Sequence, residues 1–139
     1  MNKYSILADR LWQIIEEEQA AQGSLDWGDK DRKFKGLVDE FLTKIDTPNL
    51  ASFLNFFALD VAESFQSKER SFEQCDAAIN VVYSSALFID RDGYTYPALF
   101  DRVYDAFDAG EHNHFGKSEF PVEDFTIPLI NKILSEYQK

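Results

Sequence analysis

The chain has 139 residues, the length of about one domain, and we expect a single domain spanning residues 1–139. Its 25 acidic and 14 basic residues give a net charge of −11, which argues against direct binding to nucleic acid or to anionic membranes. Hydrophobic residues make up 45% of the chain and include 13 Phe, so the composition predicts a folded core and excludes a disordered chain.

Two helices are predicted in the amino-terminal part of the chain. Apolar residues recur at helical spacing over residues 4–15, and Gly23 ends that run. The turn-rich connector GSLDWGDKD follows. Its Trp27 is either an anchor for a partner or, as we favour, folds back over the first two helices. Residues 34–45 then place apolar side chains at i, i+3, i+4 and i+7, which predicts the second helix.

The third and fourth predicted helices begin at recognisable start signals. The sequence DTPNL, residues 46–50, offers an Asp or Thr cap followed by Pro at the first helical position. The helix that follows, to about residue 65, carries apolar residues on more than one face, so we expect it to be central. Ser71 and Gln74 form a capping-box pattern that opens the fourth helix, which runs to about residue 89.

The last two predicted helices flank a polar loop. Pro97 opens the fifth helix, and Gly110 is expected to end it in the left-handed conformation that a helix end favours. Residues 111–121 are predicted to form the loop, and Thr126 with Pro128 to start the sixth helix. Six amphipathic helices with short connections predict an all-α, single-domain bundle.

Cysteine usage and hydropathy predict the cellular compartment in which the protein works. Cys75 is the only cysteine, which excludes an internal disulfide bond, and its apolar helical context predicts a small core residue rather than a reactive thiol. The first residues contain no apolar run of signal-peptide length, and no window approaches the roughly 20 apolar residues of a spanning helix. We therefore expect a soluble, cytoplasmic protein.

The fifth predicted helix carries the candidate site that we favour. Asp101, Asp105 and Asp108 stand at i, i+4 and i+7, where like charges repel, and acids near a helix carboxyl end oppose the helix dipole. Mixed with tyrosine, such acids suit a protein-binding face, although a solvated face that keeps the protein soluble is the alternative. The predicted partner-binding residues are Asp90, Asp92, Tyr94, Asp101, Tyr104, Asp105, Asp108 and Glu111.

Signals for a metal or for catalysis are weak. His112 and His114 are the only histidines, whereas a zinc site needs three or four protein ligands, so any others would have to be acids. The segment DRDGYTYPALFD lacks the glycine and glutamate spacing of a calcium loop, and no nucleophile elbow or phosphate-binding loop occurs. We therefore predict no cofactor, no metal and no enzymatic activity.

Two segments, VYDAFDAGEHNH and VEDFTIPLI, are similar to stretches of bacterial proteins without an assigned activity. In size, charge and helical content the chain also resembles small acidic bacterial toxin-immunity proteins. This resemblance implies an inhibitor that binds and masks a basic site on a protein partner, and the expected partner is a nuclease toxin. Acids would speed the encounter with the partner, and aromatic anchors would slow dissociation.

Two alternatives from other functional classes remain open. The first is a metal-dependent hydrolase that uses helical carboxylates such as Asp60, Glu63 and Asp108 together with His112 and His114. The second is a structural or adaptor module that forms homodimers through its Phe-rich faces.

Overall fold

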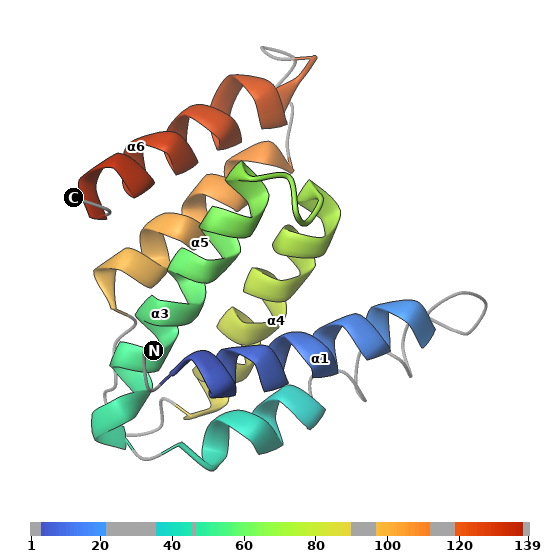
Figure 1. Cartoon of the computed structure of the whole chain (residues 1–139), viewed down its shortest axis with the longest axis vertical. Coiled ribbons are helices and arrows are strands. Elements are labelled where there is room, and N and C mark those ends of the chain that lie inside the picture. The colour runs from blue at the N-terminus through green and yellow to red at the C-terminus, as the bar shows by residue number, and fades with distance from the viewer. Residues whose placement is uncertain (1–3, 22–35, 46, 90–96, 112–118, 138–139) are drawn as a thin grey trace.

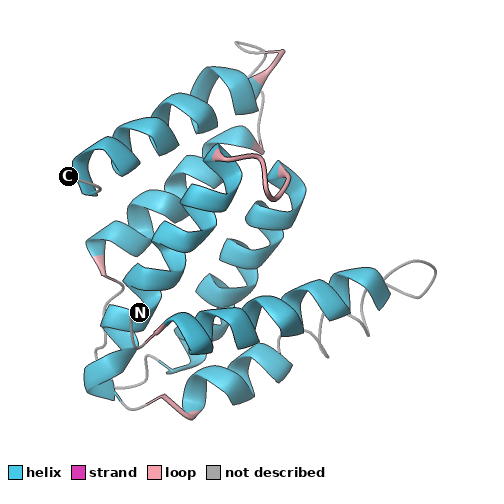
Figure 2. Ribbon diagram, in the orientation of Figure 1, coloured by secondary structure: helices cyan, strands magenta, loops and turns pink. Residues whose placement is uncertain are grey.

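The computed structural model describes residues 4–21, 36–45, 47–89, 97–111 and 119–137. The helices are α1 (Ser5–Ala21), a helical segment over residues 36–43, α3 (Thr47–Gln66), α4 (Phe72–Ile89), α5 (Ala98–Gly110), the π-helical turn η1 (Val122–Thr126) and α6 (Ile127–Tyr137). Within these ranges there is no strand, and the predicted all-α bundle is confirmed (Figure 2). None of the helices described combines the length and the apolar character that a membrane crossing requires.

Helix α3 is the centre of the bundle, as its apolar pattern predicts. It contacts α1, α4, α5 and α6, and α1 crosses one end of α3 and α4 (Figure 1). Phe53 and Phe57 of α3 are fully buried, and so are Phe100 and Phe107 of α5. A helix that is covered on several sides must carry apolar residues around most of its circumference, which is why the α3 sequence has few charges.

The start of α4 follows its sequence signal. The backbone N–H of Gln74 donates to Oγ of Ser71 over 3.2 Å, and the backbone N–H of Ser71 donates to Oε1 of Gln74 over 2.8 Å, so the predicted capping box is confirmed. Cys75 follows directly and is fully buried, also as predicted. Burial raises the pKa of its thiol to about 12, so the group is protonated at neutral pH.

The end of α5 differs from the prediction. Gly110 is the last residue of the helix, and the C-cap is Glu111, whose φ of −79° is right-handed. Close packing is what requires glycine here: a Cβ on Gly110 would overlap Oγ1 of Thr126 and lie 2.9 Å from Cε2 of Phe72. The predicted left-handed cap is therefore wrong, and the missing side chain instead lets η1 approach α5.

The last helical stretch begins before Thr126, inside the predicted loop. Its first full turn is η1, in which the N–H of Ile127 donates to the carbonyl of Val122. Thr126 is thus not a start signal; its buried hydroxyl donates to the carbonyl of Ala106 in α5 over 2.8 Å. Pro128, which lacks a backbone N–H, stands two residues after this turn, near the beginning of α6.

Candidate partner-binding site on helices α4 and α5

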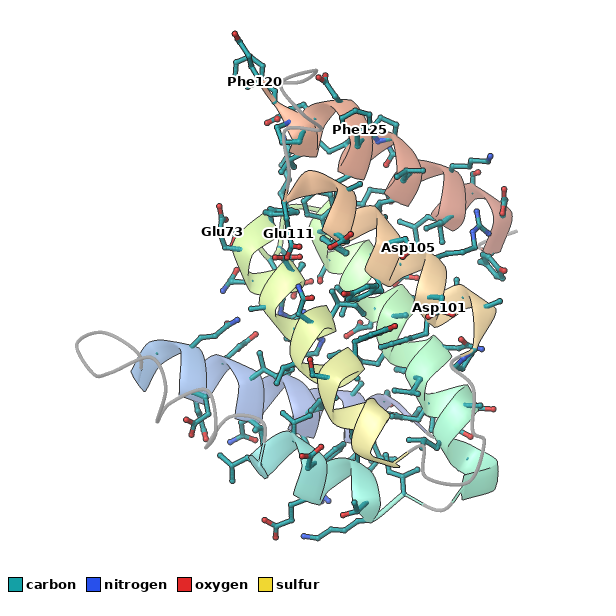
Figure 3. All side chains as sticks on the ribbon, turned by 180° about the vertical axis from the view of Figure 1, so that it is seen from behind. Glu73, Asp101, Asp105, Glu111, Phe120 and Phe125 are labelled. Atoms are coloured by element: carbon teal, nitrogen blue, oxygen red, sulfur yellow. The ribbon has the colours of Figure 1, made fainter. Side chains whose placement is uncertain are left out.

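Five of the eight predicted site residues follow one side of α5 and its C-cap: Asp101, Tyr104, Asp105, Asp108 and Glu111. Asp105 and Glu111 are exposed, and the other three are half-buried. Figure 3 shows Asp101, Asp105 and Glu111 in succession from the beginning of α5 to its end. The remaining three predicted residues, Asp90, Asp92 and Tyr94, lie outside the described residues.

Helix α4 adds a carboxyl group that the sequence analysis missed. Helices α4 and α5 run antiparallel and pack together, which brings Asp76 near the beginning of α4 to Glu111 at the end of α5 (Figure 1). Asn80, one turn further along α4, donates through Nδ2 to Oδ1 of Asp76 over 3.0 Å and to Oε1 of Glu111 over 3.1 Å. One amide thus holds two carboxyl groups from different helices.

The pKa of Asp76 shows how crowded these carboxyl groups are. Burial, a hydrogen bond to Glu111 and the negative charges of Glu111 and Asp108 together raise the pKa of Asp76 to about 8. Asp76 is therefore largely protonated at pH 7 and acts as the donor to Glu111. We call Asp76, Asp101, Asp105, Asp108 and Glu111 the acidic surface.

Two tyrosines join α4 and α5 beside the acidic surface. Tyr104 of α5 stacks on Tyr83 of α4 with ring centroids 4.0 Å apart and planes 14° from parallel. Burial, followed by the charge of Asp108, raises the pKa of Tyr104. The pair places aromatic area next to carboxylates, a combination that protein interfaces use often.

The lysine and arginine partners that the structure shows for carboxylates lie elsewhere. Ion pairs form between Arg70 and Glu16, between Lys44 and Glu40, and between Arg102 and Glu136. Although Arg102 belongs to α5, it reaches α6 rather than the acidic surface. At the acidic surface, the charged groups that raise the pKa values of Asp76 and Asp101 are other carboxylates. The local potential there is consequently negative.

Two carboxylates of the hydrolase alternative, Asp60 and Glu63, lie on α3 rather than on the acidic surface. Asp60 accepts a 2.7 Å hydrogen bond from Nε1 of Trp12, and Glu63 is exposed. His112 and His114 lie outside the described residues. In the part of the chain that the structure describes, no three His, Cys, Asp or Glu side chains meet in a way that could hold a metal ion. The hydrolase alternative stays a prediction.

Fold and site together define a small acidic α-helical bundle with a carboxylate-rich surface on two antiparallel helices. The chain matches no protein family, no curated protein and no solved structure.

Proposed function

We propose that this chain is an acidic inhibitor that binds a basic site on a protein partner through the acidic surface of α4 and α5. The observation that carries the proposal is the pair of carboxyl groups, Asp76 and Glu111, held together by Asn80 with Asp108 close by. Such crowding disfavours the ionised state of Asp76, so this carboxyl group opposes folding at neutral pH. Cationic side chains from a partner would relieve the repulsion, which gives this arrangement a use in binding.

The binding mechanism follows from the exposure of the individual groups. Asp105 and Glu111 are exposed, so they would attract a cationic partner first and raise the association rate. A lysine or arginine that then reached Asp76 would favour its ionised form, and the proton of Asp76 would leave. Binding through this site would therefore release a proton and strengthen as the pH rises toward 8.

A nuclease toxin is the partner class that we propose. A nuclease binds phosphate groups through a basic cleft, and a protein with a net charge of −11 is complementary to such a cleft. Covering the cleft would block nucleic acid without any chemical step, so the proposed inhibitor needs no catalytic group of its own.

The test is site-specific photo-crosslinking in the native host. A photoreactive amino acid at position 105 should capture a basic protein, and the same probe at Lys132 on α6 is the control. With the captured protein in hand, Asp105→Lys should weaken binding by about tenfold or more, whereas Asp9→Lys on α1 should change it by less than about twofold. The proposal fails if both substitutions act equally, or if the protein captured at position 105 is acidic.

Exposed apolar residues of α6, together with Phe120 just before η1, favour a second candidate, the homodimeric adaptor. Phe120 is 63% exposed, and Ile127, Leu129 and Tyr137 are also exposed. Figure 3 shows Phe120 projecting from the end of the bundle. Sedimentation velocity at two protein concentrations tests this candidate, because a monomer at both would exclude a dimer of useful affinity.

A further inference from the structure

A cavity of about 700 Å³ lies on a different part of the molecule from the acidic surface. Its walls are α1, residues 41–45 and Asn49 at the beginning of α3. Figures 1 and 3 both show α1 and the helical segment over residues 36–43 side by side across one end of the bundle. This volume is in the range of about 300–1,000 Å³ that small-molecule sites occupy.

Much of the cavity lining is apolar. Leu7 and Ile14 line it from α1, while Phe41 and Ile45 line it from the other side. All four are half-buried and pack with part of their surface against the hydrophobic core. Each therefore leaves some apolar surface facing the cavity, and a long apolar group could cover all of it.

The cations at the cavity contrast with the acidity of the rest of the chain. Arg10 and Lys44 both line it and both are exposed. On α1, Arg10 lies between Leu7 and Ile14, and Glu17, which also lines the cavity, lies one turn beyond Ile14. Among the described residues of the lining, two cations thus stand against one acid. The pairing of Lys44 with Glu40 is loose, at 3.6 Å between two exposed groups, so a ligand could replace it at little cost.

We propose that this cavity binds a carboxylate with a linear apolar tail, of the medium-chain fatty-acid type. The tail lies between α1 and residues 41–45, and the carboxylate meets Arg10 and Lys44 at the rim. Charge complementarity selects an anionic head group, and the apolar lining selects the tail. The proposal is independent of the proposed inhibitor function, because the two sites share no residue.

Calorimetric titration with dodecanoate, below its micelle concentration, is the first test. Dodecyltrimethylammonium, which has the same tail and a cationic head, is the matched control probe. Since the chain has a net charge of −11, unspecific attraction favours the cation. Dodecanoate should nevertheless bind with a stoichiometry of one and about tenfold or more tighter. Absence of dodecanoate binding, or equal or tighter binding of the ammonium probe, overturns the proposal.

Variants then locate the ligand. Arg10→Ala and Lys44→Ala should each weaken dodecanoate binding by about threefold or more, and Lys132→Ala on α6 should leave it unchanged. Ile14→Trp should fill the cavity and abolish binding, whereas Ile6→Trp places the same indole at a side chain that is 59% exposed and not part of the lining. Circular dichroism checks that each variant is folded.

Methyl-resolved NMR of the wild-type chain keeps the test decisive even if Ile14→Trp does not fold. Dodecanoate should shift the methyl signals of Leu7, Ile14 and Ile45 and spare that of Ile133 in α6. Shifts confined to Ile127 and Leu129 would place the ligand on the exposed apolar residues of α6 and overturn the proposed site. Neither result bears on crosslinking at position 105, so the two proposals can fail separately.

Discussion

Nε1 of Trp12 in α1 donates a 2.7 Å hydrogen bond to Oδ2 of Asp60 in α3, 48 positions away in the sequence. Arg70 lies over the same indole, with its guanidinium carbon 3.7 Å from the ring centroid, and its Nε donates to Glu16 over 2.9 Å. This contact explains why a half-buried acid is tolerated on the largely apolar helix α3. Burial raises the pKa of Asp60, and the hydrogen bond from Trp12 and the charge of Arg70 oppose that shift.

Trp12→Phe should lower the free energy of unfolding by about 1–3 kcal/mol at pH 7, since it leaves a half-buried carboxylate without its donor. The pKa of Asp60 is already raised in the folded state, and the substitution should raise it further. A raised pKa means that stability is lost as the pH rises through it, so the cost should shrink toward pH 4. Urea unfolding at both pH values measures this, with Gln13→Ala as the exposed control. An equal loss of stability at pH 7 and at pH 4 would show that the lost packing of the indole ring, and not the lost hydrogen bond, accounts for the destabilisation.

Gly110→Ala should destabilise the fold by about 1–3 kcal/mol, because the added methyl group overlaps Thr126 and crowds Phe72. Gly36→Ala is the matched control: nothing lies within 4 Å of the added Cβ, and the residue is helical. That substitution should stabilise the fold by about 0.4–1 kcal/mol, because alanine lowers the conformational entropy of the unfolded chain. Thermal unfolding of both variants checks the contrast, and a neutral Gly110→Ala would contradict the packing that we describe.

Asp76→Asn should remove a pH dependence of stability. The folded pKa of about 8 is far above the unfolded value of about 3.9. The contribution of Asp76 to the free energy of unfolding is therefore fully present below pH 4 and is lost as the pH rises through 8. On going from pH 4 to pH 9, the free energy of unfolding of Asp76→Asn should rise by about 1–2 kcal/mol relative to that of wild type, after allowance for solvent screening. Denaturation across this range measures the difference, and a constant offset from wild type would contradict a raised pKa.

Asp105→Asn and Glu136→Gln should change stability in opposite directions. Asp105 contributes to the raised pKa of Asp101 one turn away, so its neutralisation should stabilise by about 0.3 kcal/mol. Glu136 accepts a 2.6 Å bond from Nη1 of Arg102, and its neutralisation should cost about 0.2–1 kcal/mol. Unfolding at low and at high ionic strength checks both, since salt should reduce each effect. A loss of stability in Asp105→Asn would mean that this acid supports the fold.

Local sequence signals predicted the helices well wherever the deciding contacts are close in the chain. The capping box needs only Ser71 and Gln74, three positions apart, and it forms as expected. Gly110 and Thr126 were misinterpreted because their surroundings come from other helices. Gly110 packs against η1 and α4, and Thr126 donates to Ala106, 20 positions earlier.

The candidate site was predictable only in part for the same reason. Helical spacing was enough to place Asp101, Asp105 and Asp108 on one side of α5. No spacing rule connects Asp76 with Glu111, because they meet only when α4 packs on α5 and Asn80 bridges them. Asn80 at i+4 from Asp76 was the one local hint, since an amide one turn from an acid can hold it in place.

The buried thiol of Cys75 makes selective chemical labelling straightforward. A protonated, inaccessible thiol reacts slowly with maleimides, so the native residue need not be replaced. A cysteine introduced by Asp105→Cys or Lys132→Cys, both at exposed positions, would then be the group that carries a fluorophore. Anisotropy of a dye on either helix would report the approach of a second macromolecule while the aromatic interior stays undisturbed.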